Sequence, residues 1–207
     1  ITVVFNEPIE NASLNWIVNG SPVANFSPLI SGEEHNELVL IYGPMEENTV
    51  YSFTLEGVTD CWGNTAGSVT GQFAAPRTPV AGDLILNEIL YDPFEGGTDF
   101  IEIYNTASYA VSLDSCAISD ATSGEMNTPD IITERDLLLF PREFLVLTKD
   151  GRRLSEFYPE TKTNRIFKVE GMSDFSSEDV AYLLLPDGSL SDEFAYNPDF
   201  HFGSLNS

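Results

Sequence analysis

Four carboxylates in one short stretch are the residues of this 207-residue chain that could most directly do chemistry. Glu88, Asp92, Asp99 and Glu102 lie within the segment 82–105, which reads GDLILNEILYDPFEGGTDFIEIYN. Carboxylate oxygens are ligands that Ca²⁺ prefers, so one interpretation is a calcium or ligand site formed by these four residues. The other interpretation is structural, because buried polar groups are more often satisfied by backbone or side-chain donors than used as ligands.

A wide β-hairpin is expected to position these carboxylates. Two apolar runs, 83–91 and 100–105, flank a segment rich in Asp, Pro and Gly. Such a layout predicts two antiparallel strands with a turn between them. Because both runs are almost continuously apolar, we expect both faces of both strands to be covered by protein.

The charge of the chain narrows the classes of partner. Nine Lys and Arg stand against 33 Asp and Glu, for a net charge of −24, while 42% of the residues are hydrophobic. A folded, acidic protein of this kind is not expected to bind nucleic acid or anionic membranes, since phosphate binding depends on Lys and Arg. No run approaches the roughly 18 apolar residues of a membrane span, so we expect no membrane insertion. The acidic surface is interpreted either as solvated and soluble or as a source of calcium ligands.

The first part of the chain predicts an all-β domain over residues 1–78. Strand-like pieces at 2–5, 37–42, 50–57 and 69–75 alternate with turn signals and show no helical period. The cleanest pattern places Tyr51, Phe53 and Leu55 on one face, as in a half-buried antiparallel strand. Short strands at this spacing are typical of a β-sandwich.

This first part resembles the bacterial Ig-like domains that occur in tandem on surface proteins. The matching pieces are VVFNEPI, YSFTLEGV and the turn V-T-D-x-x-G-N at 58–64. In that turn we interpret Asp60, Gly63 and Asn64 as structural, because Asp and Asn bond nearby backbone and glycine accepts a positive φ. A metal-binding role for Asp60 is the weaker alternative.

A linker with two prolines, residues 75–82, precedes a second predicted domain at 82–207. Further strands are expected at 111–119, 136–140, 143–148, 180–185 and 191–196, with one short helix near 154–158. The tetrapeptide Pro186–Ser189 is a hairpin signal. The fold class predicted for the whole chain is therefore all-β, with two tandem Ig-like β-sandwiches.

The second domain is similar to the lamin tail domain, in the form found in large secreted proteins of Bacteroidetes-type bacteria. The similarity rests on LILNEILYDP, DFIEIYN, VSLDSCAIS, FPREFLVLT and VAYLLLPDGSLSDEFAY, in this order. It implies an Ig-like accessory module without catalytic residues. The family's Asn-Glu and Glu-x-Tyr-Asn positions fall on Glu88 and Glu102 and on the motif residues Asn87, Tyr104 and Asn105. Cys116 stands where the family usually has tryptophan.

Other reactive side chains are expected to be structural. His35 and His201 lack Cys or His neighbours at zinc spacing. Cys61 and Cys116 are expected to be two free, largely buried thiols, with an inter-domain disulfide as the alternative. No nucleophile elbow, zinc-protease, phosphate-loop or dinucleotide motif occurs.

The sequence therefore predicts a module that is not an enzyme and needs no cofactor, with calcium as the open exception. We expect spacing, display or protein interaction within a larger secreted or cell-surface protein, on the bacterial outer surface. Its partners would be other domains of that protein, a cell-surface protein or a glycan. The alternative is a carbohydrate- or calcium-binding accessory module of an adhesin or hydrolase, with stacking surfaces on Trp62, Tyr91 and Phe94. The chain is also expected to be an excerpt of its parent, because it enters directly into a strand.

Overall fold

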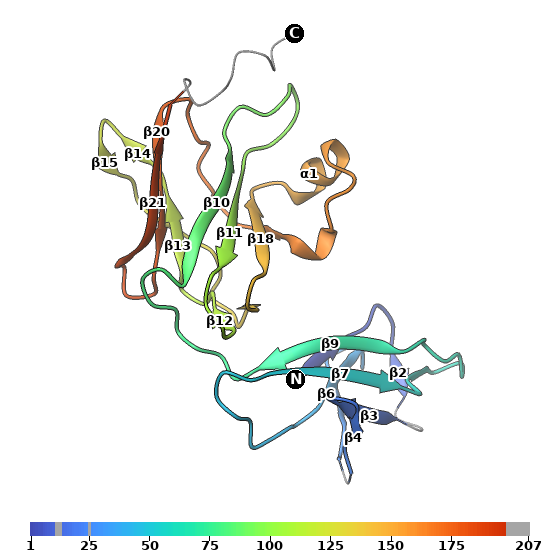
Figure 1. Cartoon of the computed structure of the whole chain (residues 1–207). Coiled ribbons are helices and arrows are strands. Elements are labelled where there is room, and N and C mark those ends of the chain that lie inside the picture. Colours follow the sequence, from blue (N-terminus) through green and yellow to red (C-terminus); the bar gives the residue numbers. More distant parts are fainter. Residues whose placement is uncertain (11–13, 25, 198–207) are drawn as a thin grey trace. The chain divides into compact units, whose positions relative to one another are not determined.

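The computed structural model describes residues 1–10, 14–24 and 26–197 (Figure 1). The chain divides into two compact units, residues 1–75 and 76–207, at the start of the proline-containing linker. Strands dominate both units, which confirms the predicted all-β class. None of the described helices has the length and apolar character needed to cross a membrane.

The first unit contains a four-stranded sheet in the order β4-β3-β7-β9, a three-stranded sheet in the order β1-β6-β5, and the pair β2-β8. Its strands are β1 (Thr2–Val4), β2 (Ile9–Glu10), β3 (Asn15–Val18), β4 (Ser21–Pro22), β5 (Leu29–Ser31), β6 (Glu37–Val39), β7 (Val50–Glu56), β8 (Thr59–Asp60) and β9 (Val69–Ala74).

Strand β7 shows the predicted alternation. Tyr51, Phe53 and Leu55 are buried, while the residues between them are exposed or half-buried. They pack with Trp16 and Phe73 in the core of this unit, where the Tyr51 and Phe73 rings stack with centroids 5.1 Å apart. Aromatic side chains bury large apolar areas, so a few of them suffice for the core of a small unit.

The second unit contains two four-stranded sheets, ordered β10-β11-β18-β19 and β16-β13-β20-β21, and the pairs β12-β17 and β14-β15. Its elements are β10 (Leu84–Leu90), β11 (Phe100–Asn105), β12 (Val111–Ser112), β13 (Ala117–Ser119), β14 (Ala121–Thr122), β15 (Glu125–Met126), β16 (Asp130–Ile131), β17 (Leu138–Leu139), β18 (Phe144–Thr148), α1 (Gly151–Phe157), the 3₁₀ turn η1 (Thr163–Arg165), β19 (Ile166–Lys168), β20 (Asp179–Leu184) and β21 (Leu190–Tyr196).

One apolar core joins the two four-stranded sheets into a sandwich. Ile103 and Leu147 from one sheet and Ile118 and Leu183 from the other belong to the same buried cluster. At one edge the sheets are joined through β10 and β21, where the Leu86 N–H donates to the Asp192 carboxylate over 2.8 Å. Strand β10 is thereby tied to β21.

The hairpin of β10 and β11 forms as predicted, but its two faces are not equally covered. In β11 the buried residues alternate with half-buried ones, and Asn87 and Glu88 of β10 are exposed. The register shifts between Leu86 and Glu88, so Asn87 lies at a β-bulge. The expectation that both faces are covered was wrong: the outer face is covered only in part, by α1 and the residues that follow it.

Other elements of the second unit refine the sequence prediction. The strand-rich segment 111–119 contains two strands, β12 and β13, separated at Ser115, whose φ is +60°. Strand β19, which was not expected from the sequence, pairs in parallel with β18. The predicted short helix is confirmed as α1 but begins earlier, at Gly151, where the Asp150 side chain caps it by accepting from the Arg153 N–H.

Candidate functional site

The structure divides the four hairpin carboxylates into two separate groups. Glu88 on β10 and Glu102 on β11 are direct cross-strand partners on the outer face of the sheet. Asp99, three residues before Glu102, is directed inward and is buried, and Asp92 is exposed in the connecting loop. Asp99 stands directly before β11, and successive residues of an extended chain point to opposite faces. The odd spacing of three residues therefore places the side chains of Asp99 and Glu102 on opposite faces of the sheet. Within the described ranges, no three or more His, Cys, Asp or Glu side chains lie together so as to hold a metal ion.

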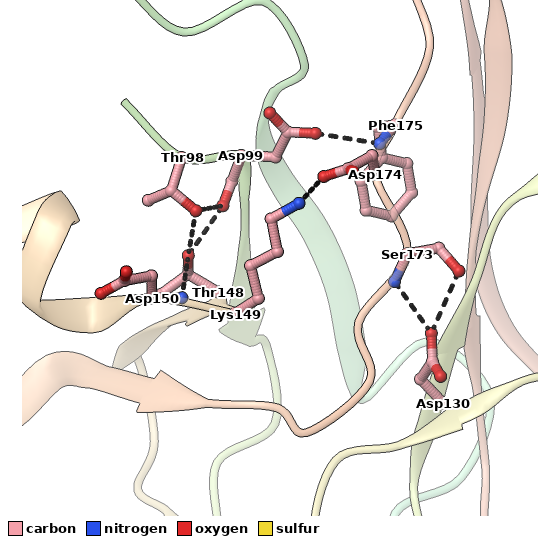
Figure 2. Close-up of polar contacts among 9 residues, drawn as sticks. All are labelled: Thr98, Asp99, Asp130, Thr148, Lys149, Asp150, Ser173, Asp174 and Phe175. Carbon is pink, nitrogen blue, oxygen red and sulfur yellow. Dashed lines mark hydrogen bonds and ion pairs between the residues drawn. The ribbon is translucent and has the colours of Figure 1, made fainter. Parts of the chain in front are cut away.

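Asp99 anchors the segment that crosses from one sheet to the other (Figure 2). This crossover segment, residues 169–178, follows β19 and leads into β20. The Phe175 N–H donates to the Asp99 carboxylate over 3.0 Å. The hydroxyl of the fully buried Thr148 donates to the Asp99 backbone carbonyl over 2.8 Å. Asp99 thus links the hairpin loop, β18 and the crossover segment.

Two further contacts hold the same crossover segment. The Asp130 carboxylate accepts from the Ser173 N–H over 3.1 Å, and Lys149 forms an ion pair with Asp174 (Figure 2). Burial raises the pKa of Asp99, the Phe175 N–H and the Lys149 charge oppose that rise, and Asp92 adds to it. The position of Asp99 is explained by the backbone it binds, which is a structural use of a carboxylate.

Glu88 and Glu102 line a pocket of about 240 Å³ on the outer face of the sheet. The Asn87 side-chain amide donates to Glu102 over 2.8 Å. Partial burial raises the pKa of the Glu88 carboxyl, and the neighbouring charge of Glu102 raises it further. The remaining walls of the pocket are mostly apolar and come from the sheet, from α1 and from the loop that follows α1: Leu90, Phe100, Val146, Leu154, Tyr158 and Thr161.

Comparison with known families decides the assignment of this unit. A sequence model described as Lamin Tail Domain matches residues 77–198, which is more than half of the chain. The chain belongs to the lamin tail domain family. The match does not include the first unit, whose relation to bacterial Ig-like domains stays a prediction.

Comparison with solved structures and curated proteins adds little to the family assignment. One similar solved structure is the crystal structure of a DUF4876 family protein from Bacteroides thetaiotaomicron VPI-5482. The two are 16% identical with a TM-score of 0.36, and the similarity covers 78% of this chain and 64% of that one. The chain therefore spans less than two thirds of that structure. No curated protein matches.

In the lamin tail domain, the motif residues carry structural contacts. Asn105 is fully buried, and its amide donates to the carbonyls of Tyr109 and Leu139 over 3.0 and 2.8 Å. Its side-chain oxygen accepts from the Ala107 N–H over 2.9 Å. Tyr104 packs on Phe144 with ring centroids 4.5 Å apart. Asn105 therefore satisfies three backbone groups at the end of β11.

The first unit uses Asp60 in a turn. The Asp60 carboxylate accepts from the backbone N–H groups of Trp62 and Asn64 over 2.9 and 2.8 Å and from the Asn64 amide over 2.6 Å. The Asn64 side chain is the main cause that lowers the pKa of Asp60. Gly63 has a φ of +85°, a conformation that favours glycine.

The three candidate stacking aromatics are not brought together within one unit. Trp62 is 75% exposed and belongs to the first unit, whereas Phe94, 74% exposed, belongs to the lamin tail domain. Tyr91 stacks on the buried Tyr196 with ring centroids 4.9 Å apart. A platform of several exposed, coplanar rings is not formed by these residues within either unit.

The thiols and histidines differ from one another in exposure. Cys116 and Cys61 are both free, but only Cys116 is buried. The expectation that both thiols are buried was wrong for Cys61, which lies in the turn after β8. His35 is exposed in a loop, and His201 lies outside the described residues.

Sequence reasoning missed two buried aspartates that hold loops of the lamin tail domain. Asp179 accepts from the Ala121 N–H over 3.0 Å and from the Ser176 hydroxyl over 3.1 Å. Asp120 accepts from the Asn127 amide over 2.8 Å. Asp120 follows the short apolar strand β13 and Asp179 immediately precedes the apolar run 180–185, and an acidic residue at the border of such a run is the signal that could have identified them as loop anchors.

Proposed function

We propose that the chain is a non-enzymatic module that spaces, displays or attaches other domains of a larger secreted or cell-surface protein. The lamin tail domain family is generally non-catalytic. The extracellular location of this proposal rests on the similarity of the sequence to the form of the domain found in secreted bacterial proteins.

The observation that carries the proposal is the use of the buried carboxylates. The buried acidic residues of the described chain are Asp60, Asp99, Asp120 and Asp179, and each accepts hydrogen bonds that hold a turn, a loop or the crossover segment. A carboxylate held by such donors is already satisfied, so it is poorly suited to move protons or to coordinate a metal. These carboxylates serve a rigid scaffold.

The buried thiol of Cys116 supports the same proposal. Burial, together with the charge of Asp114, raises its pKa to about 12. The thiolate is the nucleophilic form of cysteine, and at neutral pH it is almost absent at such a pKa. Cys116 therefore acts as a core side chain and not as a nucleophile.

A melting experiment tests this scaffold against the calcium-binding alternative. The protein is unfolded thermally in EDTA and then in millimolar calcium, and the scaffold role predicts equal melting temperatures. A ligand at a hundred times its Kd, binding only the folded state, would add about 2.7 kcal/mol, or several degrees. A shift of that size, abolished by Asp92→Asn or Asp99→Asn, would replace the scaffold proposal with a calcium-stiffened module.

A glycan array tests the carbohydrate-binding alternative. The wild-type protein is compared with Trp62→Ala and Phe94→Ala, which remove the two most exposed candidate rings. The scaffold role predicts no saturable glycan signal. A signal lost in either variant, with unchanged folding, would establish carbohydrate binding instead, because aromatic faces are the expected stacking surfaces.

A further inference from the structure

The pocket that contains Glu88 and Glu102 is amphipathic. Its floor is the outer face of β10, β11 and β18. Helix α1 lies beside β18 (Figure 1) and contributes Leu154, a residue from the middle of the helix, to the wall. Phe100 and Tyr158 meet edge to face, with ring centroids 6.3 Å apart. The carboxylates of Glu88 and Glu102 are the charged side chains among its lining residues.

The two carboxylates are not neutralised by a described cation. The ion pairs found in the described part of the chain use other acids, and neighbouring Arg152 and Arg153 of α1 pair with Glu156 and Asp150. Like charges placed directly opposite on adjacent strands are unfavourable. The charge of this pair is therefore available to a cation from outside the chain.

The shape and chemistry of the pocket select among cations. Drug-sized ligands use pockets of about 300–1,000 Å³, so a pocket of about 240 Å³ fits one long side chain better. A bare Ca²⁺ ion requires six to eight oxygen ligands, which the apolar walls do not supply. An arginine side chain has an apolar stem for the walls and a planar fork of five donors for two adjacent carboxylates. Its guanidinium can also stack on the face of Phe100 or Tyr158.

We propose that this pocket binds an arginine side chain presented by a partner polypeptide. The inference rests on the proposed function as an attachment module and names the partner chemistry, a peptide segment with an accessible arginine. Glu88 and Glu102 form the charged end of the site, and Leu90, Phe100 and Tyr158 enclose the stem. The acidic character of the chain favours approach of such a basic segment.

The test compares two blocked tripeptides, acetyl-Gly-Arg-Gly-amide and the same peptide with citrulline. Citrulline has nearly the shape of arginine without its charge. ¹H–¹⁵N spectra of the full chain are recorded with each peptide at increasing concentration. The arginine peptide should give saturable shifts in amides of β10, β11 and α1. The citrulline peptide should bind at least about tenfold more weakly, which is the effect expected when a charged hydrogen-bonding partner is lost.

Three variants make the test specific. Glu88→Gln and Glu102→Gln preserve side-chain size, and each should weaken arginine-peptide binding about tenfold. Glu125→Gln makes the same charge change on the exposed β15 strand and should leave binding unchanged. The spectrum of each variant without peptide shows whether the sandwich is intact.

Several outcomes would overturn the inference. These are equal binding of the two peptides, no saturable shift, shifts located elsewhere, or equal weakening by Glu125→Gln. Stronger binding of the matching lysine peptide would also contradict it, because a lysine ammonium lacks the planar guanidinium fork that two adjacent carboxylates can bind. None of these outcomes affects the scaffold proposal, which the calcium and glycan experiments test separately.

Discussion

Asp99 and Glu102 show how side-chain direction determines the use of a carboxylate. They are close in sequence, yet Asp99 reaches inward to the Phe175 N–H while Glu102 lies on the outer face opposite Glu88. The inward group is satisfied by backbone, and the outward pair repel each other. Two predictions at the scale of single residues follow from burial and charge.

Replacing Glu88 by glutamine should stabilise the lamin tail domain at pH 7. The change removes a cross-strand repulsion, and pair energies of this kind are about 0.2–1 kcal/mol, equivalent to a rise of roughly 1–5 °C in Tm. The folded state raises the pKa of Glu88 above 4.5, so this group favours folding below that pH and the contribution is lost as the pH rises through the folded pKa. The gain from glutamine should therefore be clear at pH 7 and small near pH 4.

Thermal unfolding of Glu88→Gln and wild type at both pH values measures this difference. Glu125→Gln, on exposed β15, serves as the control for a general loss of negative charge. A gain of the same size at both pH values would contradict the charge-repulsion explanation, as would a loss of stability at pH 7.

The two thiols should differ in reactivity in the native protein. Cys61 is exposed, whereas Cys116 is fully buried with a pKa raised to about 12. Iodoacetamide should therefore label one cysteine per native chain and two in denaturant, as counted by mass spectrometry. Cys61→Ser should remove the native label, and rapid native labelling of Cys116 would show that the core opens.

At the scale of elements, the crossover segment depends on side chains from other parts of the sandwich. Asp99 precedes β11, Thr148 ends β18 and Asp130 begins β16. Through them the residues between β19 and β20 are attached to both sheets, either directly or through the hairpin loop. An exposed ion pair, Lys149–Asp174, adds to these contacts.

The buried hydrogen bond of Thr148 should matter more than the exposed ion pair of Lys149. Thr148→Val keeps the side-chain shape but removes the donor to the Asp99 carbonyl, which should cost about 1–3 kcal/mol of unfolding free energy. Lys149→Met should cost about 0–1 kcal/mol, because exposed ion pairs contribute little. Urea unfolding of both variants compares them, and a larger loss from Lys149→Met would contradict this order.

The elements that the sequence could predict are those whose patterns are local. The alternation of Tyr51, Phe53 and Leu55 identified β7, and Pro186–Ser189 identified the turn between β20 and β21. Strand β19 could not be found this way because its pairing with β18 is non-local and its three residues show no period.

The candidate site was only partly predictable for a similar reason. Glu88 and Glu102 were correctly placed on adjacent strands, but their grouping with Asp99 ignored the two-residue period of a strand. The pocket above this pair also requires Leu154 from α1 and Tyr158, the residue that follows the helix. No local pattern indicates that this helix packs over the outer face of the hairpin, since that contact is set by tertiary structure.

At the scale of the whole molecule, each unit has its own hydrophobic core. Leu55 belongs to the buried cluster of the first unit, and Leu147 belongs to that of the lamin tail domain. Both side chains are fully buried. Separate cores are the physical condition for separate unfolding.

Calorimetry should therefore show two transitions that respond to different substitutions. Leu55→Ala and Leu147→Ala should each cost about 2–5 kcal/mol in the unit that contains the leucine. Each substitution should lower the temperature of one transition and leave the other within error. A single transition that shifts with either substitution would instead show that the two units unfold cooperatively.

The bond between Leu86 and Asp192 has a consequence for biosynthesis. It joins residues 106 positions apart, and beside it the Ser191 hydroxyl donates to the Leu84 carbonyl. Chains emerge from the ribosome N-terminus first, and distant pairings form late. We expect ribosome-stalled chains that stop at Pro186 to stay protease-sensitive and those extended beyond Tyr196 to become resistant once both strands are free of the exit tunnel. Strand β10 must therefore wait until β21 is translated before these two bonds form, and until then its outer edge lacks them.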